Sequence, residues 1–167
     1  MFREMRRKAQ QLPLEETLRV LENGRTGVLT VNGDEGYPYA VPLNYVWDGQ
    51  ALYFHSACEG HKTDALNRDN RVSFCVVERD TIVPWLFATA YRSAILSGRA
   101  QVVQEDEERR YALERLNQKY APDLPEEGQR EIAEAFSRVC IIKLVPEHLS
   151  GKAAAPRVQQ AGKGTGE

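Results

Sequence analysis

The chain has 167 residues, which is enough to bury the core of one domain but short for two. Its 42% hydrophobic and 28% charged residues, with a formal net charge of −2, lack the basic excess of a general nucleic-acid binder. The apolar runs are far shorter than the roughly 18 residues that cross a bilayer. Residues 1–11 contain no apolar signal region. We therefore expect a cytoplasmic protein with no membrane partner.

The first element is expected to be an amphipathic helix over residues 12–23. Leu14, Leu18 and Leu21 recur on one face of this helix, and Gly24 follows its end. Turns rich in Gly, Asn and Asp then separate three runs with strand composition. The three predicted strands are residues 25–31, 37–47 and 51–57.

Two prolines, Pro38 and Pro42, lie inside the second of these strands. Proline has no N–H to donate to a neighbouring strand. We therefore expect residues 37–47 to lie at a sheet edge, at a bulge, or against something other than a strand. The two successive hairpins predict an antiparallel meander.

The second half of the chain predicts six further elements. Helices are expected at residues 61–69, 106–120 and 126–136, and strands at residues 70–78, 92–103 and 139–147. The strand at 92–103 is long enough to bend at Gly98. Residues 80–91 are expected to be a loop, whose Trp85, Leu86 and Phe87 pack in the core or at a subunit interface, or else form an apolar wall over a ligand.

Six antiparallel strands with few helices predict a mainly β, α+β domain. Closing such a sheet into a small barrel removes the exposed edges of a single sheet. Residues 1–152 would form this domain. Residues 153–167, which are rich in Gly, Ala and Gln without periodicity, are expected to be a flexible C-terminal tail.

The three cysteines, Cys58, Cys75 and Cys140, are far apart and form no CxxC pair. An odd and scattered set is typical of reduced thiols in a cytoplasm. We therefore expect free thiols, with Cys75 and Cys140 in the core.

The stretch "YFHSACEGHKTDAL", residues 53–66, reads as a strand that turns at a glycine into a helix. Gly60 allows an unusual backbone angle, and His61, Lys62 and Thr63 would fill a first helical turn whose N–H groups lack partners. A helix N-terminus binds anions, and Lys62 there favours a phosphate site to which Ser56 adds a hydroxyl. The alternative is that Lys62 is solvated and that Ser56 or Thr63 only caps the helix.

The histidines divide into two kinds. His55, inside a strand, is expected in the core or at the barrel rim, whereas His61 is expected at the mouth of a site. No acidic or thiolate partner lies at a recognised metal-ligand spacing from any of the three histidines, His55, His61 and His148. We therefore predict no metal site.

Three segments, "GYPYAVPLNY", "YFHSACEGHK" and "YRSAILSGRA", carry a resemblance in their order and spacing. From about Leu14 to Gly151 the chain resembles the pyridoxamine 5′-phosphate oxidase-like split-barrel flavoproteins, and most closely their nitroimidazole-resistance (nitroimidazole reductase) branch. The resemblance implies a six-stranded antiparallel split β-barrel with flanking helices. It also implies a homodimer that binds FMN in a groove between its subunits.

The resemblance further implies which residues hold the cofactor. The isoalloxazine would be lined by Val41, Pro42, Leu43 and Asn44. The ribityl and phosphate would be approached by His55 and Ser56, and the phosphate end would be held by His61 and Lys62. Ser93 would reach the flavin of the partner subunit, and His61 is the candidate catalytic proton donor, because imidazole titrates near neutral pH.

The implied function is an FMN-dependent oxidoreductase that passes electrons from NADH or NADPH to a small acceptor such as a 5-nitroimidazole. Alternatives are haem as the acceptor, or a haem- or flavin-binding storage or sensor protein without turnover. A pyridoxamine 5′-phosphate oxidase-type oxidase is disfavoured, because "VPEHLSGKAAAP" does not supply the arginine-rich substrate contacts of that enzyme.

Overall fold

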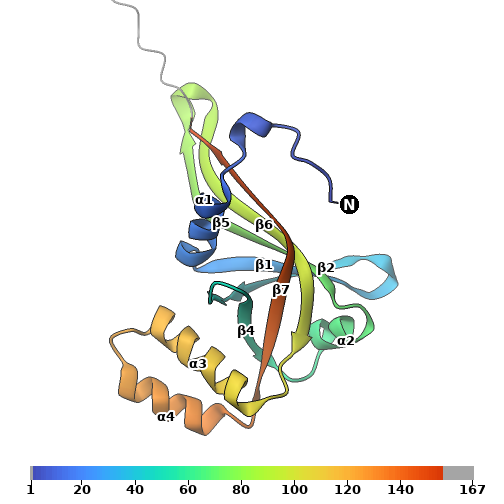
Figure 1. Cartoon of the computed structure of the whole chain (residues 1–167), viewed down its shortest axis with the longest axis vertical. Helices are drawn as coiled ribbons and strands as arrows, with labels where there is room; N and C mark the ends of the chain where they lie inside the picture. Colours follow the sequence, from blue (N-terminus) through green and yellow to red (C-terminus); the bar gives the residue numbers. More distant parts are fainter. Residues whose placement is uncertain (1, 156–167) are drawn as a thin grey trace, which may run out of the picture.

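The computed structural model describes residues 2–155 (Figure 1). The strands are β1 (Thr26–Asn32), β2 (Pro38–Asn44), β3 (Val46–Trp47), β4 (Leu52–Ala57), β5 (Arg71–Val83), β6 (Ala88–Val102) and β7 (Val139–Ala154). The α-helices are α1 (Leu14–Asn23), α2 (His61–Arg68), α3 (Asp106–Tyr120) and α4 (Pro125–Ala135). Short 3₁₀ turns are η1 (Lys8–Gln10), η2 (Asp34–Gly36) and η3 (Pro84–Leu86). No helix within residues 2–155 is long and apolar enough to span a membrane.

The strands form one antiparallel sheet in the order β2-β1-β5-β6-β7-β4-β3. Strands β2 and β3 occupy its two ends, although only Tyr45 separates them in the chain. The sheet must therefore curl until its ends approach each other, which is the closure that a barrel requires. The prediction of a mainly β antiparallel split barrel is confirmed.

The structure within these residues has seven strands where the sequence predicted six. The difference arises at Tyr45, where the predicted strand 37–47 divides into β2 and β3. The hydroxyl of Tyr120 on α3 accepts the backbone N–H of Tyr45 at 2.9 Å and lies 2.6 Å from its carbonyl oxygen. Because a side chain satisfies these backbone groups, they do not join a strand ladder.

Strands β5 and β6 form a much longer hairpin than predicted. Their pairing continues through the expected loop to Val83 opposite Ala88, and η3 forms the tip at the end of the molecule opposite α3 and α4 (Figure 1). Trp85 and Phe87 at this tip are 75% and 98% exposed. The expectation that this segment packs in the core of its own chain is therefore wrong.

Strand β7 runs along β6 to Ala154, beyond the predicted strand end at 147 and the predicted domain boundary at 152. The expected bend at Gly98 is confirmed by a shift of register between Ser97 and Gly98. A side chain at Gly98 would collide with the carbonyl of Val145. Residues 156–167 of the predicted tail lie outside the described residues.

The main core lies between the inner face of the sheet and helices α1 and α2, and a second cluster packs α3 on β3, β4 and β7. Helix α1 buries Thr17, Val20 and Leu21, while Leu14 is 65% exposed. The predicted apolar face is therefore correct at Leu18 and Leu21 but wrong at Leu14. Each fully buried aliphatic side chain contributes about 1.5–3 kcal/mol relative to exposure.

Candidate functional site

The corner between β4 and α2 leaves the N-terminus of α2 open. Gly60 has φ 121°, a backbone angle that side chains strongly disfavour. The hydroxyl of Thr63 donates to the carbonyl of Gly60 at 2.7 Å, and that of Ser56 donates to the carbonyl of Ala57 at 2.8 Å. Neither hydroxyl caps the helix, so the capping alternative is wrong. The first-turn N–H groups of α2 keep their capacity to bind an anion.

Lys62 lies in this first turn and is half-buried. Within residues 2–155 no carboxylate lies within ion-pair distance of its ammonium group. Burial lowers the pKa of Lys62 from its usual value, because the charged form loses part of its hydration. The alternative of a freely solvated lysine does not fit this environment. An anion at the helix N-terminus would restore a favourable partner to the charge.

His61 begins α2 and faces the turn between β1 and β2. Its ring stacks on Tyr39, with 4.1 Å between the ring centroids. Its Nε2 atom lies 3.4 Å from Oδ2 of Asp34, whose other oxygen pairs with Arg68 at 2.7 Å. The side chain of His61 is 35% exposed, so it has limited access to solvent. The sequence alone did not identify Asp34 and Tyr39 as neighbours of His61, because only the packing of α2 against the turn brings them there.

Strand β2 lies at the edge of the sheet and pairs along one side with β1. The edge prediction made from its two prolines is therefore confirmed. Val41 and Leu43 are half-buried toward the core side, whereas Pro42 and Asn44 are exposed on the opposite side. The free edge of such a strand carries unpaired backbone N–H and C=O groups. Strand β2 can thus offer backbone groups and the side chains of Pro42 and Asn44 to a ligand.

The two predicted residues on β4 alternate across the sheet. His55 is exposed, and Ser56 is 8% exposed. The placement of His55 in the core is therefore wrong, and a rim position remains. Its neighbours Phe54 and Ser56 take the inward positions of the barrel wall, and Ile141 lies opposite His55 on β7.

The side of the sheet that faces away from the core exposes apolar side chains on adjacent strands. We call this side the outer face, defined by Val28, Pro42, Cys75, Val77, Ser93 and Ile95. Pro42, Cys75 and Ile95 lie in one cross-strand row through Val28. Val28, Val77 and Ile95 are 38%, 54% and 50% exposed. Contiguous exposed apolar surface of this kind marks an interaction site.

Ser93 lies on this outer face, opposite Val77 on β5 and Lys152 on β7. Strands β1 and β5 separate β6 from β2, and three strand spacings amount to about 14 Å. The fold therefore keeps Ser93 apart from the β2 residues of its own chain. The corner residues, by contrast, gather around the start of α2, near the β1–β2 turn.

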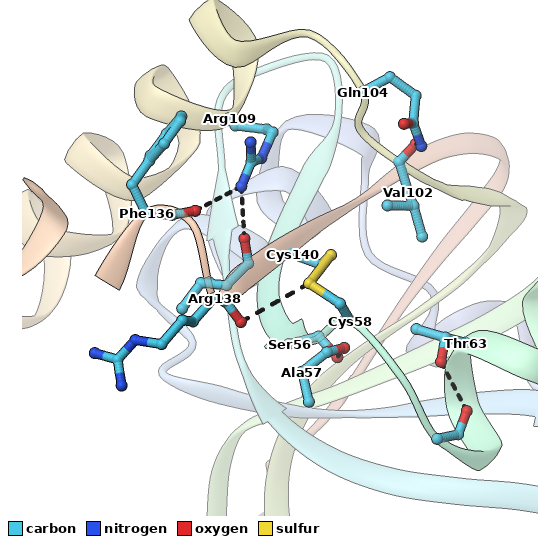
Figure 2. Close-up of a disulfide and its surroundings, with 12 residues drawn as sticks. Ser56, Ala57, Cys58, Thr63, Val102, Gln104, Arg109, Phe136, Arg138 and Cys140 are labelled. Carbon is cyan, nitrogen blue, oxygen red and sulfur yellow. Dashed lines mark hydrogen bonds between the residues drawn. A yellow bond between two sulfur atoms is a disulfide. The ribbon is translucent and has the colours of Figure 1, made fainter. Parts of the chain in front are cut away.

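A disulfide joins Cys58, just after β4, to Cys140 on β7, with 5.0 Å between the Cα atoms (Figure 2). The expectation of three free thiols, with Cys140 in the core, is therefore wrong. The cause is tertiary: Cys140 pairs with Ser56 in the β4–β7 ladder, which brings Cys58 within bonding reach. The disulfide ties down the segment that leads from β4 to Gly60.

The remaining cysteine, Cys75, is a free thiol on the outer face and is half-buried. Its predicted place in the core is wrong, because the core positions of β5 are the flanking Phe74 and Val76, each 0% exposed. Partial burial raises the pKa of the Cys75 thiol. Among the described residues, no group of three or more His, Cys, Asp or Glu side chains forms a metal site.

Comparisons with known proteins give a family and a set of structural relatives. The family model described as pyridoxamine 5′-phosphate oxidase matches residues 13–153. No curated protein matches the chain. A candidate 5-nitroimidazole antibiotic resistance protein from Bacteroides thetaiotaomicron is 24% identical, over 85% of each chain, with a TM-score of 0.71.

Two further solved structures share the fold. A FAD-binding protein from Mesorhizobium loti is 23% identical over 87% of this chain and 98% of its own, with a TM-score of 0.64. A FAD and heme binding protein from Mycobacterium smegmatis is 19% identical over 90% of this chain and 77% of its own, with a TM-score of 0.72.

Proposed function

This chain belongs to the pyridoxamine 5′-phosphate oxidase family, and we propose that it is an FMN-dependent oxidoreductase that acts as a homodimer. The observation that carries the proposal is the environment of Lys62. A half-buried ammonium group without a carboxylate partner in residues 2–155 lies in the first turn of a helix that has no side-chain cap. The terminal phosphate of FMN supplies the missing negative charge.

The other proposed contacts follow from their positions around this corner. His61 lies beside Lys62 at the phosphate end, and His55 and Ser56 occupy the adjoining end of β4. The edge strand β2 provides backbone groups of Val41 and Leu43 for the pyrimidine edge of the ring system. Pro42 and Asn44 provide outward side chains for its face.

The homodimer is proposed from the outer face. Its exposed Val28 and Val77, on β1 and β5, gain from burial against a second copy, since apolar area removed from water contributes about 25 cal/mol per Å². Ser93 lies on this face and is remote from the β2 residues of its own chain. A second subunit packed on the outer face would let Ser93 contact the flavin of its partner.

When bound, a flavin supplies the hydride acceptance and electron transfer that no side chain provides. The chain's own contribution is to bind and orient the reactants and to exclude water. We assign proton donation to the imidazole of His61, which stacks on Tyr39 and whose Nε2 lies 3.4 Å from Oδ2 of Asp34. The electron donor is a reduced nicotinamide, NADH or NADPH. The likeness to the Bacteroides protein supports a 5-nitroimidazole as the acceptor.

The decisive experiment is an absorption spectrum of the purified protein, followed by mass identification of the released cofactor. We expect the bands of an oxidised flavin and the mass of FMN. Oxidation of NADH or NADPH in the presence of a 5-nitroimidazole then tests turnover. A colourless protein that takes up no flavin on titration would rule the proposal out.

Haem binding is the second candidate, because the Mycobacterium smegmatis relative is described as binding FAD and heme. That relative and the one from Mesorhizobium loti also make FAD the alternative flavin. A Soret band in the same spectrum would favour haem, and the released mass separates FAD from FMN. A pyridoxamine 5′-phosphate oxidase-type oxidase is disfavoured further, since the β7 segment 145–155 contains no arginine.

A further inference from the structure

The segment that precedes α1 lies across the outer face of β6 and β7 as a strap, residues 2–12. At one end Gln11 forms a β-bridge with Lys152, and the N–H of Leu12 donates to the carbonyl of Gly151 at 3.0 Å. At the other end the ring of Phe2 stacks on His148, with 4.6 Å between centroids and 10° between planes. The strap is therefore held at both ends.

Between these two attachments the strap and the sheet line an open cavity of about 510 Å³. Arg3, Glu4 and Lys8 line it from the strap, and Ile95, His148 and Lys152 line it from the sheet. Pockets for small-molecule ligands and cofactors are typically about 300–1,000 Å³. The cavity is thus large enough for a substantial part of a nucleotide.

The charge of this cavity opposes that of the whole protein. It has three cationic side chains, Arg3, Lys8 and Lys152, and one carboxylate, Glu4, which pairs with Lys8 at 2.7 Å. Arg3 and Lys152 have no ion-pair partner within residues 2–155. The chain as a whole carries a formal net charge of −2. A local cationic excess in a cleft favours a polyanionic ligand.

The stacked pair of Phe2 and His148 adds an aromatic surface to this cationic site. Phe2 remains 47% exposed although it stacks on the imidazole. A flat aromatic surface of this kind receives a base by stacking. Cationic side chains and an aromatic platform together match a nucleotide better than an inorganic anion.

We propose that this cavity binds the adenine-nucleotide half of the nicotinamide dinucleotide electron donor. Arg3 and Lys152 contact its phosphates, and Phe2 stacks on its base. The position fits that role, because Lys152 lies directly opposite Ser93 in the β6–β7 ladder. The nicotinamide would then extend toward the flavin that Ser93 serves. This inference rests on the proposed function for the identity of the ligand.

The test is calorimetric titration of NADP⁺ into the flavin-loaded protein at low ionic strength. We expect Arg3→Gln and Lys152→Gln each to weaken binding about ten-fold or more, as for a lost charge-assisted contact. Glu4→Gln should strengthen binding, because it removes the one carboxylate that lines the cavity within residues 2–155 and frees Lys8. Arg130→Gln, on the distant helix α4 and 70% exposed, is the matched control and should change nothing.

The outcomes separate this inference from the proposed function. Arg3 lies in the strap outside the sheet, so Arg3→Gln tests binding even if Lys152→Gln disturbs β7. Unchanged NADP⁺ affinity in Arg3→Gln and in a folded Lys152→Gln would overturn the site, as would the absence of NADP⁺ binding to the wild type. A protein without flavin that still binds NADP⁺ through Arg3 would contradict the proposed function but keep the site.

Discussion

The imidazole of His61 and the phenol ring of Tyr39 lie almost parallel, with 4.1 Å between their centroids and 22° between their planes. This contact joins the first residue of α2 to the edge strand β2. Asp34, in the turn before β2, lies 3.4 Å from the same imidazole and also pairs with Arg68 at the end of α2. The proposed phosphate corner and the proposed flavin-lining strand are therefore held together as one unit.

Lys62→Ala should weaken FMN binding by about one to two decades in dissociation constant. The reason is the loss of a charge-assisted phosphate contact of about 1.5–3 kcal/mol. The melting temperature of the cofactor-free protein should hardly change, because Lys62 has no ion pair within the described residues. Titration of FMN by fluorescence quenching measures the effect. Arg130→Ala is the control, and equal affinity in Lys62→Ala and wild type would exclude the phosphate site.

His61→Phe should weaken FMN binding less than Lys62→Ala does, and it should lower the rate of turnover. Phenylalanine can keep the stack on Tyr39, whereas it has no nitrogen to hold a proton near Asp34. The ratio of kcat in His61→Phe to that in the wild type, measured across pH, separates the two roles. Loss of FMN affinity with unchanged kcat in the saturated variant would show that His61 only binds the cofactor.

Val77→Asp should convert the proposed dimer into a monomer and reduce FMN occupancy. A carboxylate at this outer-face position, where Val77 is 54% exposed, would be buried without a partner in the dimer. Light scattering gives the mass, and the flavin-to-protein absorbance ratio gives the occupancy. Leu124→Asp, at a similarly exposed site between α3 and α4, should leave both unchanged. A wild-type mass near 19 kDa with full occupancy would contradict the dimer.

Reduction of the Cys58–Cys140 disulfide should lower the melting temperature. The bond joins two residues 82 positions apart, for which loop-closure entropy alone gives up to about 4.5 kcal/mol. Melting with and without a phosphine reductant measures the loss. The Cys58→Ser/Cys140→Ser variant should melt like the reduced wild type and ignore the reductant. Cys75→Ser should keep the full response, because Cys75 is a free thiol.

Because of Lys119, the free energy of unfolding should rise with pH between about pH 8 and pH 9.5. Its ammonium group donates to the carbonyl of Gly24 at 2.6 Å, and burial, with Arg25 nearby, lowers its pKa from 10.5 to about 8. The unfolded chain therefore holds the proton more tightly than the folded protein, and raising the pH removes this destabilising difference.

The control variant for this prediction is Lys119→Met. Denaturant unfolding gives the free energy of unfolding of the wild type and of this variant at each pH. The wild type should gain about 1 kcal/mol relative to the variant across this range, after allowance for partial exposure. The range stops below pH 10, because burial raises the pKa of Tyr45 and Tyr120, which reverses the slope where tyrosine ionises in the unfolded chain. Parallel pH profiles for the two proteins would contradict the assignment to Lys119.

Local patterns in the sequence determined the elements and the class of fold. The glycine at Gly60 and the polar first turn after it predicted the start of α2, and two prolines predicted the edge position of β2. Two successive hairpins and the number of predicted strands indicated the antiparallel barrel. These features could be read because each depends on backbone geometry and side-chain periodicity within a few consecutive residues.

Only the tertiary structure decided the features that join distant segments. The disulfide between Cys58 and Cys140 depends on the β4–β7 register, and the break at Tyr45 depends on the hydroxyl of Tyr120. The partners of His61 and the place of the strap depend likewise on how elements pack. A sequence records which residues form a strand, but the register and packing that bring two residues together result from the free energy of the whole core.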